Sequence, residues 1–257
     1  VSANSFIETI EMGYNVIKSL KKNLLKLGLN TNIGDEGGFA PFLSNTNEAL
    51  DLLLKSINDS KYNPGDDISI ALDIASTEFY KDGKYEFKGE NISRNSEDMI
   101  KFYENIVNNY PIISIEDGMA EDDWEGWRDL TSALGSKIQL VGDDLFVTNI
   151  ERLKEGVQKE AGNAILIKPN QIGTLSETID TIRFAQKNKF NPIISHRSGE
   201  TEDETIADIA VATNSEQIKT GSLARSDRTS KYNQLIRIDE ELGSLGALSD
   251  FPFRKSR

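Results

Sequence analysis

The chain contains 257 residues, of which 37% are apolar and 28% charged, a balance typical of a globular protein with a sizeable core. It has no cysteine, which excludes disulfides, thiol catalysis and zinc–thiolate sites. With 42 acidic and 29 basic residues the net charge is −13, and no apolar run approaches the length of a membrane span. Nucleic acid is therefore not an expected partner, because phosphate neutralisation needs clustered lysine and arginine.

The first expected element is a helix close to the amino terminus. Ser5 and Glu8 have the spacing of a capping box, which predicts a helix that begins directly after Ser5. Val1 is not an initiator methionine, and the residues after it are not those of a signal peptide. We therefore expect the sequence to begin inside a fold.

Short apolar runs then alternate with amphipathic helical stretches. Capping boxes that begin at Thr148, Thr174 and Thr201 predict three of the helices, and apolar residues at helical spacing predict another after Ser96. Runs that are apolar nearly throughout are typical of strands buried on both faces of a parallel sheet. This alternation predicts an α/β fold. The expected strands are Ile68–Leu72, Ile112–Ile115, Ile138–Val141, Ala164–Ile167, Pro192–Ile194 and Gln217–Ile218.

An ionisable residue lies at the carboxyl end of every expected strand. Doubly wound sheets and (β/α)₈ barrels both satisfy the strand–helix alternation. In a barrel, however, the carboxyl ends of the strands converge on one face, where active sites lie. The regular placement of these groups therefore favours a barrel. The six residues are Asp73, Glu116, Asp143, Lys168, His196 and Lys219.

Three of these strand ends carry carboxylates, at Asp73, Glu116 and Asp143. Mg²⁺ prefers oxygen ligands and keeps coordination positions for water or substrate. A single carboxylate at such a position more often caps a turn or a helix, but three in register indicate a metal site. The sequence therefore predicts a hard-cation site at this face.

The remaining groups suit an anionic substrate. Lys168 precedes a proline, which favours extended backbone at the strand end, and a lysine held beside cations can serve as a neutral base. His196, Arg197 and Ser198 precede the helix expected near Thr201, an arrangement typical of a phosphate site. His196 is the only histidine, which excludes a metal site built on two histidines. An acidic Gly-rich loop, residues 34–38, completes the set.

The motifs that contain these residues resemble those of enolases over nearly the whole chain. The resemblance weakens only after Gly243. The motifs include GDEGGFAP at 34–41, SIED at 114–117, DDL at 143–145, LIKxNQIG at 166–173, SHRSGET at 195–201, QIKTG at 217–221 and YNQLIRI at 232–238.

The resemblance implies an enzyme, a Mg²⁺-dependent phosphopyruvate hydratase that converts 2-phosphoglycerate to phosphoenolpyruvate in glycolysis. By the matching motifs, Asp73, Glu116 and Asp143 bind Mg²⁺. Lys168 removes the C2 proton and Glu36 assists loss of the C3 hydroxyl. The substrate-binding residues implied are His196, Arg197, Ser198 and Lys219.

The resemblance also implies what the sequence lacks. An enolase has an amino-terminal domain and two further barrel strands, one of which carries a second catalytic glutamate. We therefore expect residues 1–243 to form an incomplete enolase-type TIM barrel, with six of the eight strands behind an amino-terminal helical segment, and residues 244–257 to form a tail. The expected complete protein is a cytoplasmic homodimer, and this chain alone is expected to have little activity.

Two alternatives stay open. The chain resembles other members of the enolase superfamily, such as acid-sugar dehydratases, less well, because their Lys-x-Lys and His–Asp patterns are not evident. A second alternative is a non-catalytic role, in which the barrel is secreted or displayed on the cell surface and binds a partner.

Overall fold

A computed structural model describes residues 1–249, 251 and 253. The chain forms two compact units. The first unit contains Val1–Ile68 and the described residues from Ile194 to Phe251, and the second is built on Ser69–Ile193. None of the described helices is both long enough and apolar enough to span a membrane. The predicted tail, residues 244–257, falls partly outside the described residues.

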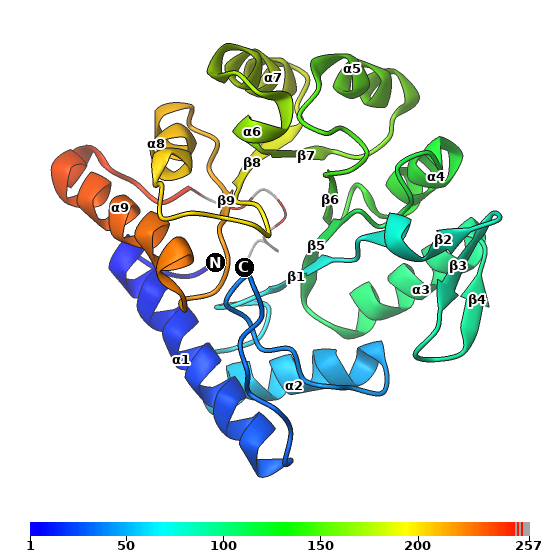
Figure 1. Cartoon of the computed structure of the whole chain (residues 1–257), viewed down its shortest axis with the longest axis horizontal. Coiled ribbons are helices and arrows are strands. Elements are labelled where there is room, and N and C mark those ends of the chain that lie inside the picture. The colour runs from blue at the N-terminus through cyan, green and yellow to red at the C-terminus, as the bar shows by residue number, and fades with distance from the viewer. Residues whose placement is uncertain (250, 252, 254–257) are drawn as a thin grey trace. The chain divides into compact units, whose positions relative to one another are not determined.

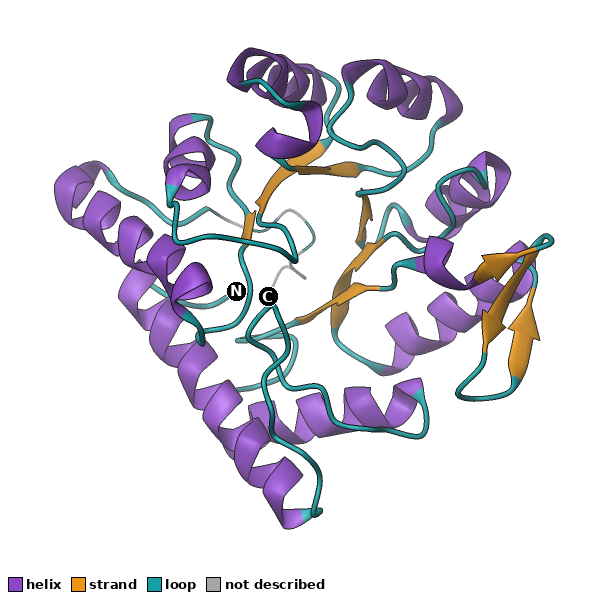
Figure 2. Cartoon of the chain, in the orientation of Figure 1, coloured by secondary structure: helices purple, strands orange, loops and turns teal. Residues whose placement is uncertain are grey.

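The second unit alternates strands with helices, as the sequence predicts (Figure 1). Its strands are short and mostly buried, except that the first of them, residues 70–73, buries only Ile70. Its helices lie outside the strands (Figure 2). Figure 2 distinguishes the strands (orange) from the helices (purple) by colour. The elements are β1 (Ile70–Asp73), β5 (Ile112–Glu116), β6 (Gln139–Gly142), β7 (Ala164–Ile167), α3 (Ser96–Asn109), α4 (Trp124–Leu134), α5 (Ile150–Lys159), α6 (Pro169–Ile172) and α7 (Leu175–Lys187).

The strand order decides between the two α/β architectures. β8 (Asn191–Ser195) begins in the second unit and ends in the first, where it pairs in parallel with β9 (Ile218–Lys219). The sheet order is β1-β5-β6-β7-β8-β9, so every strand lies beside the next parallel strand of the chain. A doubly wound sheet reverses its order at a switch point, whereas a barrel does not. The prediction of an α/β fold with six strands of an incomplete TIM barrel is confirmed.

The parallel register brings the strand ends level with one another. Asp73 is paired with Glu116, and Glu116 is paired with Val141, two residues before Asp143. Lys168 follows the last residue of β7. All six predicted strands form, with bounds that differ from the predicted ones by no more than a few residues. The ionisable groups predicted at strand ends therefore do lie there.

The first unit holds the long helices. α1 begins after Ser5, whose hydroxyl accepts the N–H of Glu8 at 3.1 Å, so the first predicted cap is confirmed. The 34–38 loop lies between α1 and α2 in the sequence. The elements of this unit, apart from the end of β8 and β9, are α1 (Phe6–Lys26), α2 (Thr46–Asp59), α8 (Thr205–Ala212), α9 (Ser226–Leu242) and the 3₁₀ turn η2 (Gly243–Leu245).

Two of the other three predicted capping boxes are wrong. Thr174 does cap α7, because its hydroxyl accepts the N–H of Glu177. Asn149 caps α5 in place of Thr148, whose hydroxyl is buried and contacts Gln171. α8 begins at Thr205 rather than near Thr201. The hydroxyl of Thr148 contacts Gln171 and Lys168 instead of capping a helix. The hydroxyl of Thr201 accepts the N–H of Asp203 in a turn before the helix.

The sequence analysis did not predict a small antiparallel sheet between β1 and α3. Its hairpin is joined to the loop after β5 through Tyr85, whose hydroxyl donates to Asp123 at 2.7 Å and accepts the N–H of Ala120 at 3.1 Å. The guanidinium of Arg94 stacks on the Phe87 ring. The sheet consists of β2 (Tyr80–Lys81), β3 (Lys84–Phe87) and β4 (Ile92–Arg94), preceded by the 3₁₀ turn η1 (Ser76–Phe79).

Candidate active site

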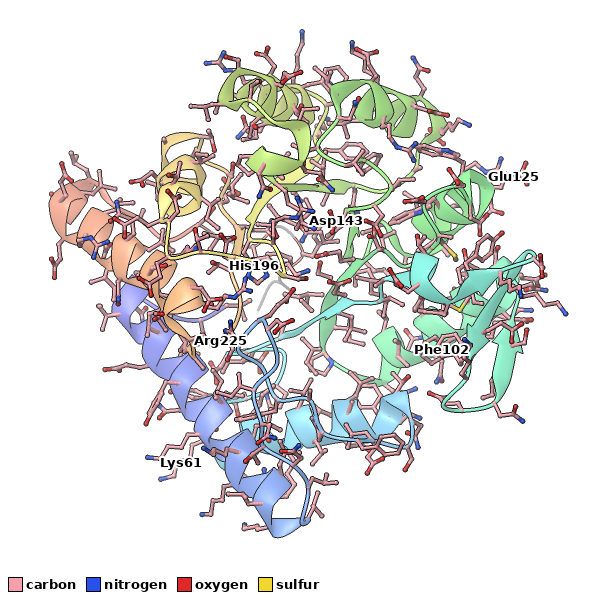
Figure 3. All side chains as sticks on the ribbon, viewed as in Figure 1. Lys61, Phe102, Glu125, Asp143, His196 and Arg225 are labelled. Carbon is pink, nitrogen blue, oxygen red and sulfur yellow. The ribbon has the colours of Figure 1, made fainter. Side chains whose placement is uncertain are left out.

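The acidic strand ends of the second unit form the first part of the site. Glu116 and Asp143 are buried, with 6% and 8% of their surface exposed, whereas Asp73 is exposed. Figure 3 shows Asp143 just beyond the end of β6. Its Oδ1 is buried and has no hydrogen-bond partner in the structure, although a buried carboxylate oxygen normally has one. A bound cation would satisfy this oxygen.

A third buried carboxylate, Asp117, holds the turn that contains Asp143. Its Oδ1 accepts the N–H of Asp143 and its Oδ2 accepts the N–H of Asp144, each at 2.9 Å. The Asp117 backbone also donates to Val141 and accepts from Ser76. The segments after β1, β5 and β6 are therefore tied together at Asp117, which itself adopts a positive φ of 44°.

Burial makes the negative charge of this cluster costly. It raises the pKa of Asp117 to about 7, and the two backbone N–H groups oppose that rise only in part. The pKa of Asp144 is also raised, first by burial and then by the charge of Asp143. Carboxylates that cannot all ionise at low cost are the groups that a divalent cation would stabilise.

Two overlapping sets of carboxylates could bind such a cation. Asp117, Asp143 and Asp144 each offer an oxygen, and these oxygens lie within 4.8 Å of one another. The sequence predicts Asp73, Glu116 and Asp143 instead. Because both oxygens of Asp117 already accept backbone N–H groups, we consider Asp117 a residue that positions Asp143 rather than a ligand. Asp143 belongs to both sets.

Lys168 contacts the acidic cluster directly. Its Nζ donates to Oδ2 of Asp143, the oxygen that does not lack a partner. The backbone at Lys168 is extended, as the following proline predicts, and its N–H donates to the buried hydroxyl of Thr148 at 2.9 Å. Strand β7 and the contact with Thr148 thus fix the position of Lys168, the predicted base. This position is next to Asp143, a predicted metal ligand.

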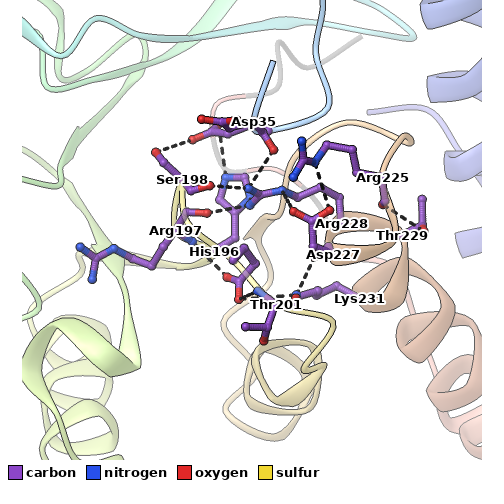
Figure 4. Close-up of polar contacts among 12 residues, drawn as sticks. Asp35, His196, Arg197, Ser198, Thr201, Arg225, Asp227, Arg228, Thr229 and Lys231 are labelled. Atoms are coloured by element: carbon purple, nitrogen blue, oxygen red, sulfur yellow. Dashed lines mark hydrogen bonds and ion pairs between the residues drawn. The ribbon is translucent and has the colours of Figure 1, made fainter. Parts of the chain in front are cut away.

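The other predicted site residues lie in the first unit, where Glu36 belongs to a polar cluster with Ser198 and His196. Figure 4 shows these two partners. Its Oε1 accepts from the Ser198 hydroxyl at 3.2 Å, and its Oε2 lies 3.5 Å from Nε2 of His196. The close approach of His196 lowers the pKa of Glu36 to about 2, against the opposing effect of burial, and the charge of Lys219 contributes. Glu36 is therefore a carboxylate at neutral pH.

The strand pair β8–β9 places two of these residues. The N–H of His196 donates to the carbonyl of Lys219 at 3.0 Å, directly after the paired residues Ser195 and Lys219. His196 is 2% exposed. The side chain of Arg197 points away from the cluster around Glu36 (Figure 4). The structure therefore brings Glu36, His196, Ser198 and Lys219 together and directs Arg197 elsewhere.

The helix predicted to begin near Thr201 begins at Thr205, so the residues predicted to bind phosphate do not directly precede a helix amino terminus. The first turn of α8 is separated from Ser198 by the 199–204 segment. The N–H of Arg197 donates to the Glu200 side chain at 3.1 Å. Any anion bound by Arg197 and Ser198 would be held by their own side chains and not by the helix terminus.

Sequence reasoning missed two buried charged residues in these clusters. Asp117 lies inside the SIED motif, next to a predicted ligand, so its position was a usable signal. Arg228 is fully buried in the first turn of α9 and contacts the backbone of the 196–198 segment. Nothing in the local sequence of α9 distinguishes Arg228 from an exposed helical arginine.

Comparison with known families agrees with this arrangement. A family model described as the C-terminal TIM barrel domain of enolase matches residues 1–256. The match covers almost all of the chain, including every strand end described above. The chain therefore belongs to the enolase family, as its C-terminal TIM barrel domain.

Proposed function

We propose that this barrel domain carries the Mg²⁺-dependent dehydration of 2-phosphoglycerate to phosphoenolpyruvate. The observation that carries the proposal is the contact between Lys168 and Asp143 at adjacent strand ends. It sets a potential base beside a potential metal ligand, as proton abstraction next to a carboxylate requires.

The residues present fit a magnesium ion. Asp73, Glu116 and Asp143 would hold it, all three with hard oxygen donors, and the unpartnered Oδ1 of Asp143 supplies one of them. When bound, the ion supplies positive charge that makes a proton beside a substrate carboxylate more acidic. The position of Asp117, which fixes the Asp143 backbone, would keep that ligand in place.

The protein residues divide the proton transfers between them. Lys168 Nζ takes the proton from C2, and the electron pair of that C–H bond forms the new C2–C3 double bond. The C3–O bond breaks, and Glu36 gives the departing hydroxyl a proton so that it leaves as water. Lys219 and Ser198 would bind and orient the anionic substrate, with Arg197 and His196.

The low pKa of Glu36 limits this role. Since its pKa is about 2, the free protein holds a carboxylate there, whereas dehydration needs the protonated acid. An anionic substrate close to Glu36 favours proton uptake by the carboxylate, because a neighbouring negative charge disfavours ionisation. In the reverse reaction the ionised carboxylate is already in the form that accepts a proton from water.

The proposal is tested by turnover and binding with matched substrates. The chain is assayed with Mg²⁺, alone and together with the amino-terminal portion of an enolase, for formation of phosphoenolpyruvate from 2-phosphoglycerate. Acid sugars are the competitor substrates and Lys168→Ala is the control. A Mg²⁺-dependent rise in melting temperature with 2-phosphoglycerate provides a second readout that does not need turnover. Turnover or stabilisation by acid sugars, with none by 2-phosphoglycerate, would overturn the assignment.

A further inference from the structure

Arg228 is a buried cation at the centre of the Glu36 cluster. It lies in the first turn of α9, with no part of its surface exposed. Its Nη1 donates to the Arg197 carbonyl at 2.7 Å, and its Nη2 donates to the carbonyls of Asp35 and Ser198 at 3.0 and 2.9 Å. Figure 4 shows the guanidinium between these segments. One side chain thus links the 34–38 loop to the 196–198 segment.

The backbone around Arg228 is shaped to admit it. A Cβ on Gly221, whose φ is +85°, would lie 2.7 Å from Arg228 Cδ and 2.7 Å from the Glu36 carbonyl. A Cβ on Gly37, whose φ is +80°, would lie 2.6 Å from the Ala224 carbonyl. Two glycines with positive φ therefore allow the close approach of the 34–38 and 221–224 segments on either side of Glu36.

The same guanidinium contacts the histidine. Nη1 of Arg228 lies 2.5 Å from Nδ1 of His196. A guanidinium can only donate, so Nδ1 must accept, and a neutral imidazole then carries its proton on Nε2. Nε2 is the nitrogen that lies 3.5 Å from Oε2 of Glu36, and this buried nitrogen makes no hydrogen bond to any of the described residues. The contact with Arg228 thus determines which nitrogen presents an N–H to Glu36.

We propose that Arg228 is a positioning residue that fixes His196 as the Nε2–H tautomer and aims this N–H at Glu36. Its consequence for turnover rests on the proposed function, whereas its consequence for the histidine does not. A fully buried cation is costly unless it is paired and hydrogen-bonded. Arg228 has both kinds of partner, because Oδ2 of Asp227 lies 3.4 Å from its Nε and the three carbonyls and His196 surround its two Nη atoms.

The tautomer can be measured directly because His196 is the only histidine in the chain. The full chain is labelled with ¹⁵N in the imidazole, and long-range ¹H–¹⁵N correlation spectra then identify the protonated nitrogen without assignment. The expected wild-type result is a protonated Nε2 and an unprotonated Nδ1. A protonated Nδ1 in the wild-type protein would overturn the proposal, even if no variant folds.

Arg228→Gln and Arg228→Met are the matched variants. Gln keeps a neutral donor and should retain part of the Nε2–H population, whereas Met removes every donor and should give a mixture of tautomers. Lys231→Met is the control, because Lys231 is equally buried on the next turn of α9 and donates to Thr201 and Asp227 without contacting His196. A pure Nε2–H form in Arg228→Met, or an equal change in Lys231→Met, would contradict the proposal.

Kinetics separates this inference from the proposed function. In the active protein, Arg228→Gln should lower kcat by about 10- to 100-fold and raise KM by less than that, since it displaces His196 and the 197–198 segment without removing their side chains. An Nε2–H histidine in a chain that neither turns over nor binds 2-phosphoglycerate would refute the function and leave the positioning role. Normal turnover with an Nδ1–H histidine would refute the positioning role and leave the proposed function.

Discussion

Asp117 holds Asp143 in place through its side chain, because Oδ1 of Asp117 accepts the backbone N–H of Asp143 at 2.9 Å. The second oxygen does the same for the next residue, Asp144. The geometry of the predicted metal ligand at the end of β6 therefore depends on a carboxylate at the end of β5. Strand ends in a barrel are positioned by the sheet, but the turns beyond them need contacts of this kind.

Asp117→Ala should destabilise the protein by about 2–4 kcal/mol, because it leaves two buried N–H groups without acceptors. Asp117→Asn keeps one side-chain oxygen as an acceptor and should lower the free energy of unfolding by less. The free energy of unfolding is measured in urea. Asp129→Ala, which removes an exposed carboxylate from the Arg128 ion pair, is the control and should change stability by no more than about 0.5 kcal/mol. Equal losses of unfolding free energy in Asp117→Ala and Asp129→Ala would show that the buried hydrogen bonds of Asp117 do not stabilise the fold.

Metal binding should distinguish the two carboxylate sets. Mg²⁺ should raise the melting temperature of the wild-type chain, because a ligand of the folded state stabilises it by mass action. Asp143→Asn should lose this rise under either assignment. If the ligands are Asp73, Glu116 and Asp143, then Glu116→Gln should lose it as well and Asp144→Asn should keep most of it.

Melting is followed with Mg²⁺ and with potassium chloride of equal ionic strength, which screens the carboxylates without specific binding. The opposite pattern, with the rise lost in Asp144→Asn and kept in Glu116→Gln, would assign the site to Asp117, Asp143 and Asp144. An equal rise in all variants would place the metal elsewhere.

Lys168 and Glu36 should affect different steps of the proposed reaction. In an active form of the protein, Lys168→Ala should stop exchange of the C2 proton of 2-phosphoglycerate with solvent, because the base is gone. Glu36→Gln should slow loss of the C3 hydroxyl and leave some C2 exchange. Exchange is measured by NMR in deuterated solvent. Normal exchange in Lys168→Ala would assign the base to another residue.

Much of the fold could be predicted because its signals are local. A run such as Ala164–Ile167, apolar on both faces and followed by Lys168 and a proline, specifies a buried strand and its end. The family motifs likewise point to the predicted ligands one strand at a time. The strand order then follows from the chain order, because short βα units place each strand beside the previous one.

The contacts that position the site could not be predicted because they are not local. Arg228 and His196 are 32 residues apart in the sequence, and Thr148 contacts Gln171 from a turn rather than capping α5. A capping spacing or a helical arginine has the same local sequence whether its side chain meets solvent or a distant loop. Only the packed structure shows which partner each polar side chain reaches.

The stability supplied by Glu36 should depend on pH in a defined window. The pKa of Glu36 is about 2 in the folded protein, against an ordinary value of 4.5, chiefly because of its contact with His196. A carboxylate whose pKa is depressed by folding stabilises the protein above its unfolded pKa. That stability is lost as the pH falls towards the folded pKa. The difference in unfolding free energy between wild type and Glu36→Gln should therefore be constant near neutral pH and shrink as the pH falls from about 5 to about 2. This difference should be well below the value that the full pKa shift would give, since 44% of the Glu36 side chain is exposed to solvent.

Urea unfolding at several pH values measures the difference, and His196→Gln provides the matched background. Without His196 the pH dependence of the Glu36→Gln effect should largely disappear. If the difference between wild type and Glu36→Gln does not change with pH, or changes equally in the His196→Gln background, the interaction of these two side chains does not stabilise the fold.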